Sequence, residues 1–557
     1  MTKKSPSGDV AEASPSAAKK KAGGTKATLA KATQVAGQAA QVSTLVLEEE
    51  ARLARDLMSV LAGTAQIEPS PGDKRFQDEA WKSNPFMRVW MQGYLSWTKA
   101  LGNVVDQAPL NDKNRERARF AVSLLTDAAA PTNSLLGNPA ALRKMVDTGG
   151  ASVAKGLKNL VSDLATNKGM PTQVDKSKFK VGQNLATTPG AVVFRSPVLE
   201  LIQYTPTTET VHARPQLMVP PQINKYYIFD LAPGKSIIEY LVANGFQVFA
   251  VSWRNPGPEH ADWAMDTYVK AILEAIAVVR EITGADDVNL HGACSGAMTM
   301  ASLMGYEAAT GASQIHAATL MVAVLDGREE SQLGLLATPQ VVALAKKNSA
   351  AKGVIEGQDM GRVFAWMRPN DLVWNYWVNN YLMGNPPPAF DVLYWNNDTT
   401  RLPARFHGDL MDMFTEHMLT IPGRMQVLGQ PIDLGKVQSD TYVLAGISDH
   451  ITPWQGVFNT AHTLGGKSEF VLSSSGHIQS LINPPGNAKA KYFISDGQAK
   501  SAESWLAGAQ TVQGTWWEHW RDWLKARSGA LVPAPTQLGS PQHPATDPAP
   551  GTYVLAK

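Results

Sequence analysis

The sequence predicts an α/β protein preceded by an all-α region. From about residue 172, short β-branched and apolar runs typical of strands alternate with amphipathic runs typical of helices. Such alternation predicts a parallel sheet with right-handed crossovers. Upstream, apolar and aromatic residues recur at three- and four-residue steps, the spacing of one face of a helix. An aromatic-rich stretch of about a hundred residues interrupts the alternation, which predicts an insertion above the sheet.

The composition is that of a soluble globular protein with more than one domain. The chain has 557 residues, of which 44% are hydrophobic and 18% are charged. A net charge of +2 gives no general argument for nucleic-acid binding. The one cysteine, Cys294, excludes an internal disulfide and fits a reducing compartment. No apolar run is long enough to span a bilayer, and no secretory signal is present, so we expect a cytoplasmic protein.

Three regions are predicted along the chain. Residues 1–75 are rich in Ala and Lys, and we expect a disordered arm, or a partly helical one over residues 1 to about 40. Its Lys19-Lys20-Lys21 is at most a weak tether to nucleic acid or an anionic surface. Residues 76–170 predict a helical N-terminal domain, with a helix start at Ser83-Asn84-Pro85. Residues 171–557 predict the α/β domain, with a cap insertion at about 327–436 and a Pro-rich C-terminal tail.

The elements of the α/β domain follow from apolar runs that end at Gly or Pro. Gly245 and Gly284 close two predicted helices. We predict a hairpin over 191–204, strands over 216–219, 247–253, 288–292, 319–325, 441–446 and 469–472, and helices over 236–243, 266–282, 296–308, about 454–463 and 516–523.

The most informative motif is Gly292-Ala293-Cys294-Ser295-Gly296, between a predicted strand and a predicted helix. This Gly-x-Cys-x-Gly spacing is typical of the nucleophile elbow of α/β-hydrolases, with Cys in place of the commoner Ser. Glycines suit this turn because it is strained and its neighbours pack closely. The alternative is a buried structural cysteine on a core strand. We therefore expect an α/β-hydrolase fold with a large cap insertion.

A cysteine nucleophile needs a base, and the base needs an orienting acid. In α/β-hydrolases the order along the chain is nucleophile, acid, histidine, each after a strand. Asp449 follows the strand 441–446, and His477 follows the strand 469–472. We favour these two residues, and Asp326 is the alternative acid because it ends the strand before the cap.

Other histidines and acids are weaker candidates. We expect His450 to be a supporting or structural residue, because neighbours in sequence diverge and cannot easily bracket one thiol. His291 precedes the elbow on a strand and is expected in the core, whereas His407 lies in the cap and could face the pocket. Asp230 and Asp371 have less suitable positions.

Acyl transfer also requires an oxyanion hole. One donor should be the backbone N–H of Ser295, directly after the nucleophile. The second should come from the loop after the strand 216–219. Pro220 and Pro221 have no N–H, so Gln222 or Ile223 is the candidate, and we favour Ile223.

With these residues in place, the chain resembles the polyhydroxyalkanoate synthases from about Ser83 to its end. One departure is Ala297, where the family usually has a second Gly after the elbow, and we expect tighter helix–strand packing there rather than lost activity. Residues 397–403 and 406–410 look most like the class II enzymes, which favour medium-chain monomers. The matching strings are Met218-Val219-Pro220-Pro221-Gln222-Ile223-Asn224-Lys225, Val251-Ser252-Trp253-Arg254-Asn255-Pro256, the elbow, Arg368-Pro369-Asn370-Asp371-Leu372-Val373-Trp374-Asn375, Asp449-His450-Ile451-Thr452-Pro453-Trp454 and Gly476-His477-Ile478-Gln479-Ser480.

The resemblance implies that Cys294 attacks the thioester of an (R)-3-hydroxyacyl-CoA and that the growing polyester is extended by a hydroxyl. His477 would take the thiol proton, and Asp449 would orient His477 or help to activate the hydroxyl. CoA is then part of the substrate and a product; no other cofactor and no metal is expected. Arg254, Arg368 and Arg401 would contact CoA phosphates or form structural pairs, and Trp374 and His450 are further candidate substrate contacts.

The resemblance also implies a homodimer at the surface of polyester granules, with granule-associated proteins as partners. The N-terminal helices would serve granule binding or dimerisation. Two alternatives stay open: a cysteine-dependent esterase or thioesterase of the same fold, and a non-catalytic granule-associated protein. An aromatic cap that excludes water favours the polymerase over the hydrolase.

Overall fold

The structure is a computed structural model that describes residues 16–329, 331–495 and 499–557. The chain divides into two compact units, Met1–Lys144 and Met145–Lys557. Helix α6 (Ala151–Thr166) groups with the second unit, whereas the sequence suggested that it belonged to the N-terminal domain. Within the described ranges, no helix is both long enough and apolar enough to cross a membrane.

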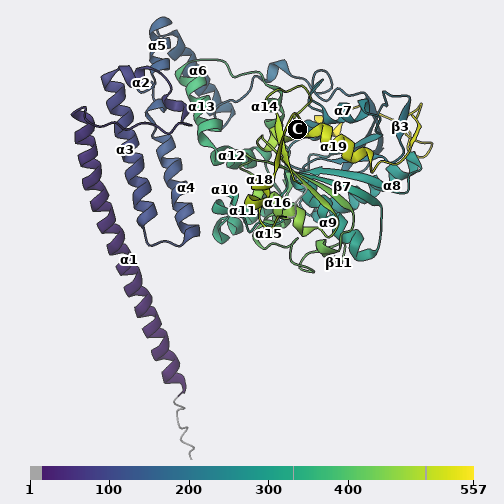
Figure 1. Cartoon of the computed structure of the whole chain (residues 1–557), viewed down its shortest axis with the longest axis horizontal. Helices are drawn as coiled ribbons and strands as arrows, with labels where there is room; N and C mark the ends of the chain where they lie inside the picture. The colour runs from purple at the N-terminus through teal and green to yellow at the C-terminus, as the bar shows by residue number, and fades with distance from the viewer. Residues whose placement is uncertain (1–15, 330, 496–498) are drawn as a thin grey trace, which may run out of the picture. The chain divides into compact units, whose positions relative to one another are not determined.

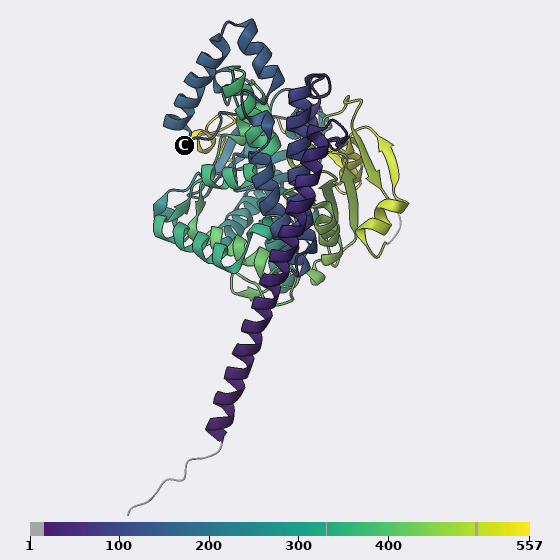
Figure 2. The same ribbon diagram turned by 90° about the vertical axis from the view of Figure 1, so that its left-hand side faces the viewer.

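The first unit begins with a long helix where the sequence predicted a disordered arm. Helix α1 (Ser16–Leu61) is drawn in purple as one uninterrupted rod in Figures 1 and 2. The prediction of disorder is therefore wrong for this part, and the helix extends well beyond the partly helical alternative that we gave for residues 1 to about 40. The residues of α1 are mostly good helix formers, and the helix packs against α3 (Pro85–Gln107). Buried Glu49 on α1 accepts a hydrogen bond of 3.0 Å from Asn103 on α3. The part of the predicted arm before residue 16 lies outside the described residues.

The rest of the first unit is helical, as predicted. Asn84 caps α3 by accepting hydrogen bonds from the N–H groups of Phe86 and Met87, which confirms the predicted helix start. A small core joins Phe76, Trp81 and Tyr94 to apolar residues of α3. The remaining helices are α2 (Ala80–Ser83), α4 (Asp112–Ala128) and α5 (Pro139–Asp147), the last of which spans the boundary between the units.

The second unit is built on a ten-stranded sheet. The six central strands are parallel and the two at each edge are antiparallel, so the sheet is mixed rather than purely parallel. One parallel strand, Ile315–Met321, lies about four residues earlier than predicted, and the last two strands of the sheet, Lys491–Ile494 and Gln510–Gln513, were not predicted. The order across the sheet is β1 (Gly190–Arg195), β2 (Leu199–Tyr204), β5 (Val248–Trp253), β4 (Gln216–Val219), β6 (Val288–Ala293), β7 (Ile315–Met321), β12 (Asp440–Gly446), β13 (Ser468–Ser473), β14 (Lys491–Ile494) and β15 (Gln510–Gln513).

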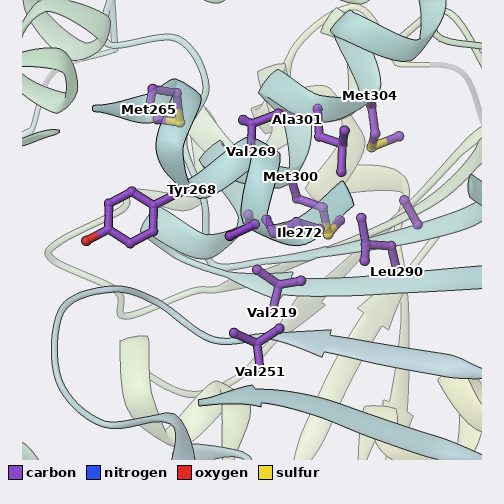
Figure 3. Close-up of a cluster of buried hydrophobic side chains, with 14 of the residues drawn as sticks. Val219, Val251, Met265, Tyr268, Val269, Ile272, Leu290, Met300, Ala301 and Met304 are labelled. Carbon is purple, nitrogen blue, oxygen red and sulfur yellow. The ribbon is translucent and has the colours of Figure 1, made fainter. Parts of the chain in front are cut away.

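Helices cover both faces of this sheet. Side chains of consecutive strand residues point to opposite faces, and the apolar ones on each face pack against helices. On one face, Val219, Val251 and Leu290 of the strands lie under the side chains of α8 (Met265–Thr283) and α9 (Ser295–Thr310), as Figure 3 shows. On the other face, Met218 and Ala250 pack in a cluster with α7 (Ile237–Ala243) and α19 (Trp516–Lys525). The tryptophans of α19 are therefore core residues. Helices α16 (Trp454–Thr463) and α18 (Ala502–Gly508) pack together near β12 and β13.

Residues 322–439, between β7 and β12, form the insertion, which we call the cap segment. It is mainly helical. Two of its turns, Asn370–Trp374 and Val378–Leu382, have the wider π-helical hydrogen bonding. Its helices are α10 (Gln332–Leu336), α11 (Pro339–Lys352), α12 (Gly357–Met367), α13 (Asn375–Trp377), α14 (Asp391–Asn396) and α15 (Ala404–Thr415), with the short strands β8 (Val354–Ile355), β9 (Leu402–Pro403), β10 (Gln426–Val427) and β11 (Gln430–Pro431).

Candidate active site

Cys294 lies in the sharp turn between β6 and α9, which confirms the predicted strand–turn–helix. Its backbone has φ +49° and ψ −124°, a conformation that is costly for a residue with a side chain. Its N–H donates a 3.0 Å hydrogen bond to the Met321 carbonyl at the end of β7, which fixes the turn on the sheet. The side chain remains partly exposed. This strained and anchored turn presents the thiol at the carboxyl ends of the parallel strands.

The two glycines of the motif are required by close backbone contacts. A Cβ on Gly296 would lie 2.5 Å from the carbonyl oxygens of Val219 and Pro220. A Cβ on Gly292 would lie 2.9 Å from Cα of Ala297. Ala297 itself is fully buried in the main core, where its methyl group packs between helix and sheet.

His477 and Asp449 are brought together beside the elbow. His477 is the first residue of α17 (His477–Leu481), and its Nδ1 lies 2.7 Å from Oδ2 of Asp449. A carboxylate only accepts hydrogen bonds, so Nδ1 carries the proton and Nε2 is left for the thiol. The Cys294 side chain interacts with His477 and helps to raise the pKa of its imidazole. The three residues therefore form a connected nucleophile–base–acid chain.

The electrostatic interactions among Cys294, His477 and Asp449 favour a proton on His477. Burial acts to lower its pKa, but the charge of Asp449 and the hydrogen bonds to Asp449 and Cys294 outweigh burial and raise the pKa of His477 to about 10. For Asp449, burial acts to raise the pKa, but the charge of His477 and the hydrogen bonds from His477 and Thr452 hold it below its ordinary value. His477 is thus a strong acceptor for the thiol proton.

Thr452 is a site residue that the sequence analysis missed. Its hydroxyl donates to Asp449 Oδ2 at 2.7 Å and lies 3.2 Å from Nδ1 of His477. The N–H groups of Ile451 and Thr452 donate to Oδ1 of Asp449 at 2.8 and 3.0 Å. Asp accepting from the N–H groups two and three residues later is a common local motif, so the string Asp449 to Thr452 carried a readable signal.

The oxyanion-hole candidates come from the elbow and from the loop after β4. The Gln222 N–H donates to the hydroxyl of Ser295 at 3.1 Å and is therefore occupied. Ile223 and Ser295 line the same cavity as Cys294. This arrangement leaves the N–H groups of Ile223 and Ser295 as the candidate donors.

An apolar cavity of about 260 Å³ adjoins Cys294. Most of its wall comes from the cap segment, together with the elbow and the Asp449 loop. His407 lines it, with Nδ1 bound to the hydroxyl of Ser349 at 3.0 Å. Its apolar wall includes Met298, Leu336, Val342, Phe364, Leu410 and Phe414. Such a cavity suits a hydrocarbon chain attached to a reacting carbonyl.

The competing residues are engaged elsewhere. Asp326 binds Arg328 and lies 3.6 Å from His417, so it does not take the place of Asp449. Asp230 is buried and accepts hydrogen bonds from the hydroxyls of Thr188 and Ser236. His291 is fully buried between Thr319 and Gln216, with both ring nitrogens hydrogen-bonded at 2.9 Å, and is a core residue as expected.

The predicted arginine contacts all have protein partners. Arg254 donates to the Tyr553 hydroxyl at 2.6 Å, Arg368 pairs with Asp371, and Arg401 lies 3.3 Å from Glu356. These pairs fit the structural role that we considered as the alternative to phosphate binding.

His450 and Trp374 remain candidate polar contacts. Burial and the charge of Arg368 lower the pKa of His450 to about 4, so its ring is neutral. Both His450 ring nitrogens and the Trp374 indole N–H are buried, and none has a hydrogen-bond partner among the described residues. Within the same part of the chain, no three His, Cys, Asp or Glu side chains converge to hold a metal ion.

Comparison with known proteins agrees with this geometry. Residues 72–241 match a family model described as the N-terminus of poly-beta-hydroxybutyrate polymerase (PhaC), and residues 221–484 match the alpha/beta hydrolase fold. The chain is 49% identical over 529 residues to poly(3-hydroxyalkanoate) polymerase 1 of Ectopseudomonas oleovorans, which covers 95% of this chain and 94% of that protein. It is 39% identical over 502 residues to the poly(3-hydroxyalkanoate) polymerase subunit PhaC of Cupriavidus necator, which covers 89% of this chain and 85% of that protein. The second unit thus has the α/β-hydrolase fold, and the chain belongs to the poly(3-hydroxyalkanoate) polymerase family.

Proposed function

We propose that the protein polymerises (R)-3-hydroxyacyl-CoA into polyhydroxyalkanoate and releases CoA, with Cys294 carrying the acyl chain. The observation that carries the proposal is the union of a Cys294–His477–Asp449 chain with an apolar cavity at the thiol. The names of the relatives support the polyester as the product.

In the first step, Sγ of Cys294 attacks the thioester carbonyl carbon. The thiol proton passes to His477, whose charge Asp449 stabilises. The N–H groups of Ile223 and Ser295 stabilise the oxyanion. When the carbon–sulfur bond to CoA breaks, His477 returns the proton to the departing thiolate, and the acyl group remains on Cys294.

In the second step, the hydroxyl of another acyl unit attacks the Cys294 thioester. His477 takes the hydroxyl proton and then gives it to the departing Cys294 thiolate, so the new ester extends the chain by one unit. The sequence left open whether Asp449 activates this hydroxyl. Both oxygens of Asp449 already accept two hydrogen bonds each, which uses its usual capacity. We therefore assign Asp449 to the orientation and charge stabilisation of His477.

The cavity supports polymerisation over hydrolysis. Its wall is almost wholly apolar, and it is the expected location of the 3-hydroxyacyl side chain. A wall of this kind also limits the water that competes with the hydroxyl for the acyl-enzyme. Because residues 397–403 and 406–410 resemble the class II enzymes, we expect medium-chain monomers.

The direct test is product analysis with (R)-3-hydroxyoctanoyl-CoA. The wild-type protein should release CoA and form polyester, and Cys294→Ala should abolish both. Gly361→Ala is a matched control, because a Cβ at Gly361 meets no atom within 4 Å. Free 3-hydroxyoctanoate as the main product would support the thioesterase instead. No CoA release at all would support the non-catalytic alternative.

We also propose that the enzyme acts as a homodimer at the granule surface in the cytoplasm. Light scattering of the purified protein tests the dimer, and fractionation of polymer-accumulating cells tests the location. A strictly monomeric active enzyme would contradict the first proposal, and an enzyme absent from the granule fraction would contradict the second.

A further inference from the structure

The loop Pro220–Lys225, which carries the candidate donor Ile223, has little regular structure of its own. Apart from the bond between Gln222 N–H and Ser295, its position depends on side chains that reach it from distant parts of the chain. Three of its carbonyl oxygens each accept such a bond: Pro220 from Trp253 Nε1 at 2.9 Å, Gln222 from Thr400 Oγ1 at 2.7 Å and Lys225 from Trp395 Nε1 at 2.7 Å. We call this segment the oxyanion loop.

The last residue of the oxyanion loop is bound to the end of the chain. The ammonium of Lys225 donates a 2.5 Å hydrogen bond to the carbonyl of Ala556, the penultimate residue. Lys225 is only 3% exposed. A buried ammonium without a partner is costly, so this bond holds both segments.

The end of the chain is itself firmly anchored. We call residues 548–557 the C-terminal strap. The fully buried carboxylate of Glu200, on β2, accepts from the N–H groups of Thr552 and Tyr553, each at 2.9 Å, and from the Thr552 hydroxyl at 2.6 Å. Gly551 has φ +77°, and a Cβ there would lie 2.4 Å from a Glu200 oxygen. Glu200 and Gly551 therefore fix where Thr552 and Tyr553 lie.

Tyr553 and Val554 complete the anchor. The Tyr553 hydroxyl donates to the Ser196 carbonyl at 2.8 Å and accepts from Arg254 at 2.6 Å, and the Arg254 guanidinium lies 4.6 Å from the centre of the ring. Val554 is 2% exposed and packs in the core beneath the sheet. With residues 552–554 held, the Ala556 carbonyl is presented to Lys225 from a fixed position.

We propose that the C-terminal strap positions the oxyanion loop, with the Ala556 carbonyl holding Lys225 so that the Ile223 N–H stays directed at the reacting carbonyl. Lys225 and the strap are then positioning elements, because neither touches Cys294. The proposal rests on the proposed acyl-transfer function. It also explains why Arg254, a candidate phosphate contact from the sequence, is committed to Tyr553.

The test compares three variants of the full protein with (R)-3-hydroxyoctanoyl-CoA as substrate. Lys225→Met removes the ammonium, and a chain that ends at Val554 removes the Ala556 carbonyl but keeps buried Val554 and the bonds to Glu200. Lys176→Met is the control, because the Lys176 ammonium also binds a carbonyl, that of Asn397 at 3.0 Å, outside the loop. Measured quantities are kcat and KM for CoA release, and the rate and pH profile of Cys294 alkylation by iodoacetamide.

We expect kcat to fall at least tenfold in Lys225→Met and in the shortened chain, toward the roughly hundredfold loss caused by removing an oxyanion donor. KM should stay within about twofold, because ground-state binding is retained. Alkylation of Cys294 and its pH profile should match wild type, since the thiol, His477 and Asp449 are untouched. Lys176→Met should resemble wild type throughout.

Two results would overturn the strap proposal. One is an unchanged kcat in either Lys225→Met or the shortened chain. The other is a parallel change of kcat, KM and alkylation, which would show general damage to the site. A wild-type protein that releases no CoA would instead contradict the proposed function, so the two failures are distinguishable.

Discussion

The elbow around Cys294 and the oxyanion loop contact each other, yet they keep their shapes by different means. The elbow is fixed by its own glycines and by one backbone bond from Cys294 to Met321 on the neighbouring strand. The oxyanion loop is fixed by side chains of β5, α9 and the cap segment and by the end of the chain. One side of the site is therefore encoded locally, and the other depends on residues up to about 330 positions away.

Because of this difference, substitutions in the two regions should have different effects. Substitutions in the elbow act directly on the nucleophile or on the residues packed against it. Substitutions in the segments that hold the loop act through the position of one N–H group, so they should lower kcat while leaving the thiol chemistry intact. Mutations in the elbow should thus change the reactivity of the thiol, whereas mutations in the segments that hold the loop should change kcat alone.

The largest effect is expected on the locally encoded side, from Asp449→Asn. An amide at this position can donate to Nδ1 of His477, which moves the ring proton to Nε2 and removes the base that faces the thiol. Loss of a triad carboxylate in this way lowers kcat by about 10⁴-fold in a well-studied case, and we expect a loss of about 10³- to 10⁴-fold. The rate of CoA release measures it, with Asp326→Asn as the control. A loss below tenfold would contradict the role of Asp449.

The same variant tests the charge coupling through pH. Because the charge of Asp449 raises the pKa of His477, Asp449→Asn should move the NMR titration of His477 from about 10 to well below that value. In the wild type, the lowered pKa of Asp449 stabilises the fold above pH 3.8, and the raised pKa of His477 does so fully below pH 6.5. The contribution of the pair to the free energy of unfolding should therefore be complete between these values and should decline toward pH 10. A His477 titration unchanged in Asp449→Asn would exclude the coupling.

A smaller effect is expected where the two sides meet, from Gly296→Ala. The added Cβ would lie 2.5 Å from two backbone carbonyls at the start of the oxyanion loop, so the elbow and the loop must move apart. We expect a loss of kcat of about tenfold to a hundredfold, and overpacking should lower the free energy of unfolding by about 1–3 kcal/mol. Gly361→Ala, which meets no atom within 4 Å, should change neither quantity by much. Equal behaviour of the two variants would show that the contact at Gly296 does not matter.

The same division explains what could be predicted from the sequence. The central strands, the elbow, Asp449 and His477 were predictable, because hydrophobic periodicity, glycine spacing and order along the chain are local signals. Helix α1 was missed because Ala and Lys are frequent both in disordered segments and in helices, and its packing on α3 is a tertiary contact. Thr452 was missed although its spacing from Asp449 was readable. The partners Thr400, Trp395 and Ala556 carried no local signal, since only the folded chain brings them to the loop.

The smallest effect is expected from Thr400→Val, which removes one of the bonds that hold the oxyanion loop. Thr400 is 3% exposed, and its hydroxyl lies 2.7 Å from the Gln222 carbonyl. Valine keeps the shape but leaves that carbonyl unpaired, at a cost of about 1–3 kcal/mol in the free energy of unfolding. Because the loop keeps its other bonds, we expect kcat for CoA release to fall only about three- to tenfold, with Cys294 alkylation unchanged. Thr400→Ser, which keeps the hydroxyl, should recover most of the rate.

Thr441→Val is the matched control, because Thr441 is equally buried and hydrogen-bonded to Ser468, but at the opposite end of β12 from Asp449. If Thr441→Val lowered kcat as much as Thr400→Val at the same loss of stability, the rate would not depend specifically on the bond between Thr400 and the oxyanion loop. A selective loss in Thr400→Val would show that the loop transmits the positions of distant side chains to the reacting carbonyl.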